Sequence, residues 1–269
     1  MRCFSLTLYT ILLLMLPLMA NAQKTGEPDV IMTDSSIQIL DPVSQVPDSL
    51  KREKAKVGLV ILDEFAKKKK IDIDYKKVEE YVTQNAEGYE QLLNRFQEDP
   101  ASLSVEEAAM LYYGFAFTKD YMPENIDTNV KLMEAFHNKN FGALKKESRR
   151  TPVSLSLLMN MAFLADEMGN EESKQKYRLM SLKLLNGIMA SGTGYSKEKA
   201  IKVLYIADEY AIFRDLMGLR LTVQDFEDRR YDRMTLETGN GGESIILWFD
   251  TYLNHQKILN DHNKKKNKK

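Results

Sequence analysis

The segment Leu111–Pro123, LYYGFAFTKDYMP, contains five aromatic residues and follows a strong helix-start signal. Ser104 and Glu107 stand three residues apart, as they do in a capping box. In that motif the serine hydroxyl accepts a hydrogen bond from the N–H of the glutamate, and the carboxylate accepts one from the N–H of the serine. The pattern therefore predicts a helix that begins at Val105 and runs into the two adjacent tyrosines of the segment.

The aromatic residues of this segment allow two interpretations. Aromatic side chains at helical spacing usually pack in a core, where a tyrosine keeps its hydroxyl hydrogen-bonded. This interpretation fits Tyr112 and Tyr113, because Gly114 next to them leaves room for a crossing helix. Aromatic rings also form platforms for sugars and peptides, so the candidate binding residues are Tyr112, Tyr113 and Tyr121. Tyr121 and Pro123 lie beyond the helix and are the more open to such a contact.

The residues around this segment predict a helical region over 72–192. Apolar residues at three-, four- and seven-residue spacings form a stripe between Val78 and Phe96, with a break near 85–88. Asp99–Pro100 ends that stretch, and further helices are expected over 128–138, 140–149, 153–168 and 171–190. The segment Val57–Lys70 is ambiguous, because its continuous apolar run fits a helix or a strand.

Residues 161–185 resemble a tetratricopeptide unit. They contain a helix, a Gly169–Asn170 turn and a second helix with Tyr177 near the position of the usual aromatic residue. The preceding residues, 132–149, resemble a partner helical hairpin. The usual early tryptophan is absent, and Lys174 fits the motif only if one residue is deleted at the turn. We expect a degenerate, tetratricopeptide-like stack of antiparallel helices.

After Gly194 the pattern changes to short runs that are rich in β-branched or aromatic residues and are separated by turn residues. Strands are expected within residues 198–252, in the runs AIKVLYIADEY, LRLTVQDF, YDRMTLET and ESIILWFDTY. The sequence TGNGGES between Leu236 and Ile245 is typical of a hairpin connection. The predicted fold class is α+β, with a tetratricopeptide-like antiparallel helical stack followed by a small C-terminal antiparallel β-sheet.

The N-terminal residues have the pattern of a secretory signal peptide. Arg2 precedes an apolar run, and Ala20–Asn21–Ala22 is a cleavage signal, so residues 1–22 are expected to be removed. The protein is then exported, and is periplasmic or secreted after cleavage at Ala22–Gln23. We expect a flexible linker over 23–47, a single α+β domain over 48–254 and a basic disordered tail over 255–269.

The composition argues against several classes of protein. Cys3 is the only cysteine, so the mature chain has no disulfide, thiol nucleophile or thiolate metal site. Removing Arg2 leaves 38 − 1 = 37 basic residues against 39 acidic residues, a net charge of −2, which gives no reason to expect a nucleic-acid partner. No segment after the leader is apolar enough to span a membrane. The basic tail, NKKKNKK, is interpreted as solvated, with contact to an anionic surface as the alternative.

No strong catalytic or ligand-binding motif is present. The three histidines, His137, His255 and His262, have no zinc-ligand spacing, and no cofactor or metal is expected. The sequence lacks a G-x-S-x-G elbow, and SGTGYSK is an incomplete phosphate loop. Asp208 and Glu209 are adjacent carboxylates, which would point to opposite faces of a strand. A turn or the start of a short helix, with Asp208 as its cap, is the favoured interpretation. No catalytic residue is predicted.

Three blocks of sequence resemble, in the same order, an uncharacterised family of exported Gram-negative bacterial proteins that is classed as a domain of unknown function. The blocks are YEQLLNRFQEDPASLSVEEAAMLYYGF (89–115), SGTGYSKEKAIKVLYIADEY (191–210) and YDRMTLETGNGGESIILWFD (231–250). The resemblance covers about residues 72–250. Trp248–Phe249 stands where Tyr-Phe is more usual, and the basic tail is an addition. The resemblance implies a fold and a compartment, and it transfers no catalytic residue.

These observations favour a non-enzymatic protein of the cell envelope that binds a protein or peptide, since stacked helix pairs form concave surfaces. One alternative is a cell-wall or carbohydrate-active hydrolase that uses acidic residues such as Asp208 and Glu209. Another is a structural protein that pairs with another chain through a sheet edge. A cleft of titratable groups would favour the first alternative, and a long bare edge strand would favour the second.

Overall fold

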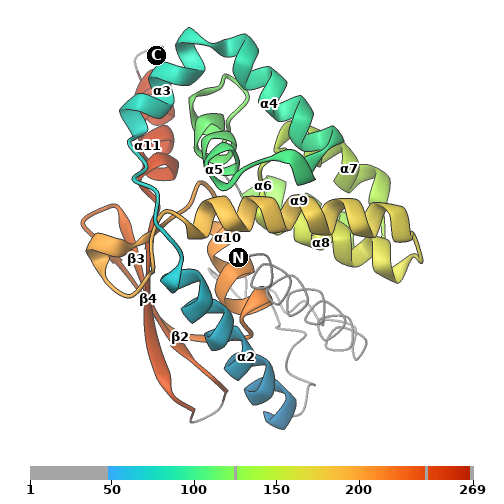
Figure 1. The fold of residues 1–269 in the computed structure, drawn as a ribbon, viewed down its shortest axis with the longest axis vertical. Helices are drawn as coiled ribbons and strands as arrows, with labels where there is room; N and C mark the ends of the chain where they lie inside the picture. The colour runs from blue at the N-terminus through green and yellow to red at the C-terminus, as the bar shows by residue number, and fades with distance from the viewer. Residues whose placement is uncertain (1–47, 124–125, 240–241, 267–269) are drawn as a thin grey trace.

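Helix α9 (Glu171–Met189) lies at the centre of the helical part of the protein (Figure 1). The structure is a computed structural model that describes residues 48–123, 126–239 and 242–266. Helices form most of it, and a small sheet lies at one side, so the predicted α+β class is confirmed. No helix in these ranges combines the length and apolarity that crossing a membrane would require.

The ambiguous segment 57–70 is helical as far as Lys67. Helix α2 (Asp48–Lys67) buries Ile61, Leu62 and Phe65, which stand at three- and four-residue spacings. The continuous apolar run hides this spacing, because its neighbour Val60 is exposed on the opposite side of the helix. The ambiguous segment is therefore a helix and not a strand.

The next three helices have the boundaries that their capping residues predict. Helices α3 (Tyr75–Gln84) and α4 (Ala86–Glu98) are separated at Asn85, whose side chain accepts from the N–H of Gly88. A 3-10 turn, η2 (Pro100–Ser102), follows α4. The predicted capping box then starts α5 (Val105–Gly114), with both of its hydrogen bonds formed. The short turn η3 (Phe115–Phe117) extends α5.

The remaining helices pack in chain order. They are α6 (Ile126–His137), α7 (Phe141–Arg150), α8 (Leu155–Glu167) and α9. Helices α8 and α9 lie side by side and antiparallel, joined by a turn in which Gly169 has a positive φ of 67° (Figure 1). Helix α5 crosses the other side of α9. The consecutive antiparallel packing agrees with a helical stack, and the described residues do not show a repeat.

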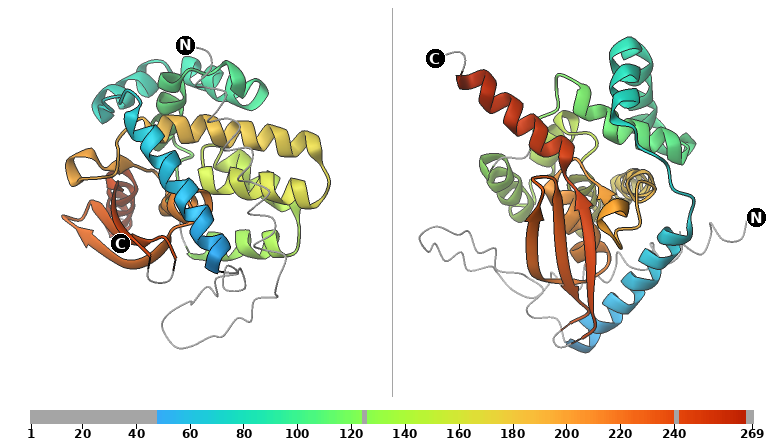
Figure 2. Two further views of the ribbon diagram at one scale, coloured as in Figure 1. Left: turned by 60° about the horizontal axis from the view of Figure 1, so that its bottom comes forward. Right: turned by 90° about the vertical axis from the view of Figure 1, so that its left-hand side faces the viewer.

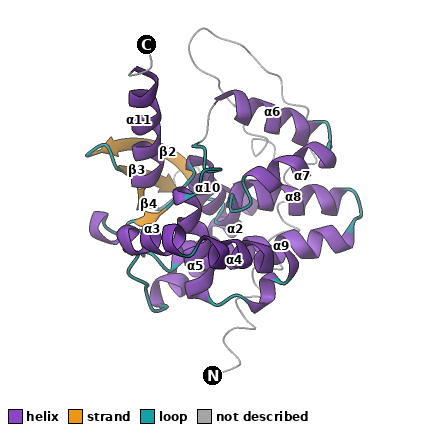
Figure 3. Ribbon diagram, turned by 90° about the horizontal axis from the view of Figure 1, so that it is seen from above, coloured by secondary structure: helices purple, strands orange, loops and turns teal. Residues whose placement is uncertain are grey.

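The sheet is mixed and has the strand order β1-β4-β3-β2. The long strands β2 (Arg220–Glu227), β3 (Tyr231–Glu237) and β4 (Ser244–Asp250) are antiparallel neighbours, as predicted. Strand β1 (Ile201–Lys202) pairs in parallel with β4, so the sheet is not purely antiparallel. Figure 3 shows the sheet on one side of the helices.

The run AIKVLYIADEY forms the predicted strand only at Ile201 and Lys202, and its last five residues form a short helix, as the favoured interpretation of Asp208 and Glu209 predicts. After β1 the chain forms α10 (Ile206–Tyr210), which continues as the π-helix η5 (Ala211–Leu216). The two helices lie against α8, and about half of their residues are buried, among them Asp208, Glu209 and Phe213. Val203, Leu204 and Tyr205 are buried between β1 and α10, so the strand ends after two residues.

The residues predicted as a disordered tail are helical as far as Lys266. Helix α11 (Tyr252–Lys266) begins directly after β4, and its first turn buries Leu253 and Asn254. The Asn254 amide donates to the carbonyl of Leu204 at 2.9 Å, which fixes the start of the helix. A Lys257–Asp261 ion pair at i,i+4 supports the exposed part. Helix-forming lysines therefore extend a helix that the core has already nucleated.

One face of the sheet packs on the helices, and no described helix covers the other face, where the Lys197 side chain lies over the rings of Tyr231 and Trp248. Asp232, Met234 and Leu236 of β3 point into the protein, whereas Arg233 and Thr235 point outward. In the right-hand view of Figure 2, no described element crosses in front of the outer face, and α11 projects beyond the end of the sheet.

The close crossing of α5 and α9 gives a test of the packing. A Cβ atom at Gly187 of α9 would lie 2.7 Å from the backbone nitrogen of Ala109 in α5. We expect Gly187→Ala to lower the free energy of unfolding by about 1–3 kcal/mol, because two backbones would have to separate. Gly142→Ala on α7 is the control: its Cβ meets only a side-chain oxygen at 3.6 Å, so it should stabilise by up to about 1 kcal/mol. Equal thermal unfolding of the two variants would contradict the close crossing.

Candidate functional site

The three candidate tyrosines are buried, and their hydroxyl groups all bond to the segment that contains β1 and the start of α10. The Tyr113 hydroxyl donates to the carbonyl of Lys202 at 2.9 Å, and that of Tyr121 donates to the carbonyl of Leu204 at 2.9 Å. The Tyr112 hydroxyl accepts from the N–H of Leu204 at 2.9 Å. The structure thus brings Tyr112, Tyr113 and Tyr121 together in the core, and none of them presents its ring at the surface.

Asp208 is the polar centre of this buried cluster. It is fully buried, and its carboxylate accepts from the Tyr112 hydroxyl at 2.7 Å and from the N–H of Ser156 at 2.9 Å. Ser156 lies in the first turn of α8, so Asp208 caps α8, whereas the sequence predicted Asp208 as the cap of its own short helix, which begins at Ile206 instead. Burial and the charge of Asp208 raise the pKa of Tyr112 well above its ordinary value. The cluster ties α5, α8 and α10 together.

Glu209 is also fully buried, beside Asp208 on α10. The two carboxylates are held inside the protein, and neither residue is exposed to solvent. A general acid and base must contact a substrate to transfer a proton to it. The hydrolase hypothesis therefore gains no support from this pair.

Asp232 and His255 form a second polar pair, under the edge of the sheet. The Asp232 carboxylate accepts from the Gln224 amide at 2.8 Å, and burial raises its pKa. Burial also lowers the pKa of His255, whose ring lies 4.5 Å from that of Phe226. The two shifts have the direction expected when both groups are held neutral. Within the described ranges no cluster of three metal-ligating side chains is found.

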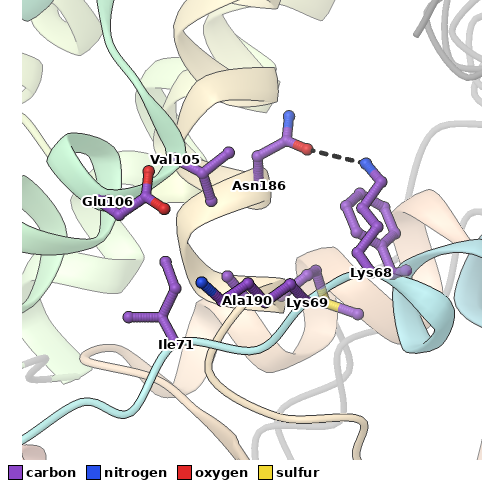
Figure 4. Close-up of a pocket in the computed structure, with 9 residues that line it drawn as sticks. Lys68, Lys69, Ile71, Val105, Glu106, Asn186 and Ala190 are labelled. Atoms are coloured by element: carbon purple, nitrogen blue, oxygen red, sulfur yellow. Dashed lines mark hydrogen bonds between the residues drawn. The ribbon is translucent and has the colours of Figure 1, made fainter. Parts of the chain in front are cut away.

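One open site is a groove of about 230 Å³ between the ends of three helices, which we call the lysine groove (Figure 4). Its apolar walls come from the C-terminal ends of α2 and α9, the start of α5 and the segment after α2. Lys68 and Lys69 lie at its rim together with Glu106 and Asn186. The apolar lining residues are Phe65, Ile71, Val105, Met189 and Ala190.

The three lysines that follow α2, Lys68 to Lys70, lead the chain along this groove. Lys70 donates to the carbonyls of Phe65 and Met189, at 2.8 and 2.9 Å, and so satisfies the C-terminal ends of two helices with one ammonium group. The N–H of Ile71 then bonds to the carbonyl of Ala190 at 2.8 Å, which holds the segment against α9.

Lys68 is held at the rim of the groove by two contacts. Its ammonium lies 4.6 Å from the centre of the Phe65 ring and 3.3 Å from the Asn186 side-chain oxygen, as Figure 4 shows for the latter. Burial lowers the pKa of Lys68. Sequence analysis missed this site, although the run of four lysines at a helix end was a signal that could have led to it.

Strand β2 forms a second open surface, at the edge of the sheet. It is eight residues long, and no strand of the described chain pairs with its outer side. Val223 and Phe226 are 48% and 49% exposed, one on each face. This is the long bare edge strand expected of a protein that pairs with another chain.

Together these features define an α+β domain in which helices and a small mixed sheet share a tyrosine–carboxylate core. Residues 76–264 match the family model described as Domain of unknown function (DUF4919), and the chain belongs to this family. No curated protein and no solved structure matches the chain.

Substitution of the two adjacent tyrosines separates the roles of their hydroxyl groups. Tyr112→Phe removes a hydrogen bond to the buried Asp208 carboxylate and one from the N–H of Leu204, so we expect a loss of about 2–3 kcal/mol in the free energy of unfolding. Tyr113→Phe removes bonds to neutral groups only, the carbonyl of Lys202 and the Ser191 side chain, and should cost only about 1 kcal/mol. Chemical denaturation measures both, and equal losses would argue against the central role of Asp208.

The raised pKa of Asp232 predicts a dependence of stability on pH. A raised pKa in the folded state means that ionised Asp232 destabilises the fold, and the penalty disappears as pH falls below the ordinary value of 3.8. Asp232→Asn should therefore raise the unfolding temperature at pH 7 by about 2–4 °C, with a gain that shrinks towards pH 3.5. Asp225→Asn, at an exposed carboxylate on β2, is the control. A gain that is independent of pH would rule out this cause.

Proposed function

We propose that this chain is an exported, non-enzymatic module that binds a protein or peptide, and that the lysine groove is its binding site. The observation that carries the proposal is the combination of an apolar floor and two lysines in one open groove. Export and a periplasmic or secreted location rest on the signal-peptide pattern of residues 1–22. The tetratricopeptide-like character of the helices belongs to the same proposal.

The size of the groove favours part of a larger partner over a whole small ligand. Pockets for cofactors and drug-sized ligands usually measure about 300–1,000 Å³. The groove, at about 230 Å³, fits one or two side chains of a peptide. A partner held by such an anchor needs further contacts on either side of it, which a polypeptide can supply.

The charges at the rim of the lysine groove favour a ligand that has an acidic group next to an apolar residue. Lys68 and Lys69 outnumber Glu106, and the ammonium of Lys68 is partly desolvated. A carboxylate that binds there gains a charge-assisted hydrogen bond and restores the ordinary pKa of Lys68. A peptide C-terminus or an Asp or Glu beside a Leu or Phe has this chemistry.

Two other hypotheses have less support. A hydrolase would need an accessible acid and base, whereas Asp208 and Glu209 are buried. Contact of the basic tail with an anionic surface rests only on the sequence NKKKNKK. Pairing through a sheet edge is the second candidate function, and the specific observation in its favour is the open edge of β2.

Binding of short peptides tests the lysine groove. Fluorescent peptides that end in Asp-Leu or Glu-Phe with a free carboxylate are titrated against residues 23–269, alongside their C-terminal amides. We expect Lys68→Ala/Lys69→Ala to weaken binding at least about tenfold, because each charge-assisted bond contributes on the order of 1.5–3 kcal/mol. Lys67→Ala is the matched control, since Lys67 is exposed, pairs with Glu64 and does not line the groove.

Two results of the peptide titration would contradict the proposal. Either no acidic–apolar peptide binds, or peptides bind equally well to the double variant and to Lys67→Ala. Turnover of a glycan or peptide substrate without groove binding would favour the hydrolase instead.

A further inference from the structure

Strand β2 has an internal symmetry that its sequence alone does not display. A β-bulge between Leu221 and Val223 leaves Thr222 outside the regular ladder, so that β2 presents seven paired positions to β3. The positions on the outer face are Arg220, Val223, Asp225 and Glu227, and those on the inner face are Leu221, Gln224 and Phe226. The two faces alternate without interruption once the bulge is taken into account.

We propose that β2 pairs antiparallel with β2 of a second copy of this chain, so that the two four-stranded sheets join into one continuous sheet. This inference rests on the sheet-edge candidate function and names its partner. A two-fold axis perpendicular to the sheet passes midway between Gln224 and Gln224 of the second copy, so that these two residues lie opposite each other. When Thr222 in the bulge is left out of the count, residues the same number of positions before and after Gln224 lie opposite each other in the two copies.

The charges at the two ends of β2 are complementary in this register. Arg220 lies opposite Glu227 of the second copy, and each already has a partner of opposite charge on its other side. Arg220 bonds to Glu237 at 2.5 Å, and Glu227 bonds to Lys197 at 3.0 Å. Pairing therefore creates a row with alternating signs, from Glu237 through Arg220 to Glu227 and Lys197 of the second copy. Cross-strand pairs of opposite charge stabilise a sheet.

The apolar residues of β2 also meet in this register. Leu221 lies opposite Phe226 of the second copy on the inner face, and Phe226 is 49% exposed in the single chain. The ring of His255 on α11 packs on the same phenylalanine at 4.5 Å and extends the apolar contact. Pairing would cover the most exposed aromatic side chain of the sheet.

The other edge of the sheet explains why assembly stops at two copies. Strand β1 has only two residues, and Ser191 accepts from the N–H of Lys202, so this edge offers no comparable ladder. An interface between two copies of the same strand is isologous and closes on itself. A two-fold dimer, not a fibre, follows from one long edge and one short edge.

Sedimentation equilibrium of residues 23–269 tests the dimer with two variants that place opposite charges at Val223. Val223 lies opposite Asp225 of the second copy, and 48% of it is exposed. Val223→Glu places like charges together twice per dimer and should weaken association roughly tenfold, whereas Val223→Lys should maintain or strengthen it. The introduced Glu and Lys side chains are both long and solvated, so any effect that they share on the stability of the fold cancels when the two variants are compared. A monomer at all concentrations, or equal association of both variants, would overturn the proposal.

A cysteine on the two-fold axis tests the register directly, because the mature chain contains no other cysteine. Gln224→Cys should form a disulfide-linked dimer on mild oxidation, since directly opposite residues have Cβ atoms within reach of each other. Asn94→Cys, exposed on α4, is the matched control and should cross-link far more slowly. Similar rates for the two variants would overturn the register.

Binding of an extended peptide with the sequence of β2 distinguishes two outcomes. Either the chain does not dimerise although its sheet edge can pair with another strand, or the edge pairs with no strand at all. If the protein stays monomeric and yet binds that peptide, and Val223→Glu changes the binding, a chain can add to the edge but a second copy does not. If the protein neither dimerises nor binds the peptide, both the dimer and the sheet-edge candidate are wrong.

Discussion

The buried carboxylate of Asp208 is the interaction on which the rest of the structure depends. A charge without solvent needs hydrogen-bond donors, and here they come from Tyr112 on α5 and from the first turn of α8. These donors belong to segments about 50 and 100 residues away in the chain. Satisfying one side chain therefore fixes how three parts of the fold are placed. The tyrosines at positions 113 and 121 add bonds to the backbone between β1 and α10, so the same region is held from several directions.

The helix boundaries could be predicted wherever a capping or turn residue lies within a few residues of the boundary. The capping box at Ser104, the break at Asn85 and the turn at Gly169 each mark a boundary through hydrogen bonds or backbone conformation within a few residues. The run after Ala200 could not be predicted in the same way. Its β-branched and aromatic residues favour a strand, but Asp208 has to reach α8, and a helix places it there. The start of α11 similarly depends on a bond from Asn254 to Leu204, which lie 50 residues apart.

The sites were less predictable than the fold. Whether a surface is open depends on whether other segments of the chain cover it, which the local sequence does not show. Aromatic residues suggested a ligand platform, but whether a ring is exposed depends on segments elsewhere in the chain, and those segments cover Tyr112, Tyr113 and Tyr121. The run Lys67–Lys70 resembles an ordinary solvated stretch until α9 and α5 are placed beside it. The sequence of β2 likewise contains no sign that it lies at an edge, since its pattern of residues fits a central strand equally well.

The two proposed surfaces are compatible, and their combination has a consequence for affinity. The lysine groove is formed by α2, α5, α9 and the segment after α2, and none of its lining residues belongs to β2. Pairing of two copies through β2 therefore leaves both grooves open, and a dimer presents two peptide sites fixed to one continuous sheet. A small groove with few anchoring contacts gives weak binding to a single peptide. Two such grooves at a fixed spacing bind a partner with repeated or paired acidic segments much more tightly, because the second contact forms at a high effective concentration. The core around Asp208 would help to keep that spacing constant, since it links α5, one of the helices that form the groove, to the segment that leads into the sheet.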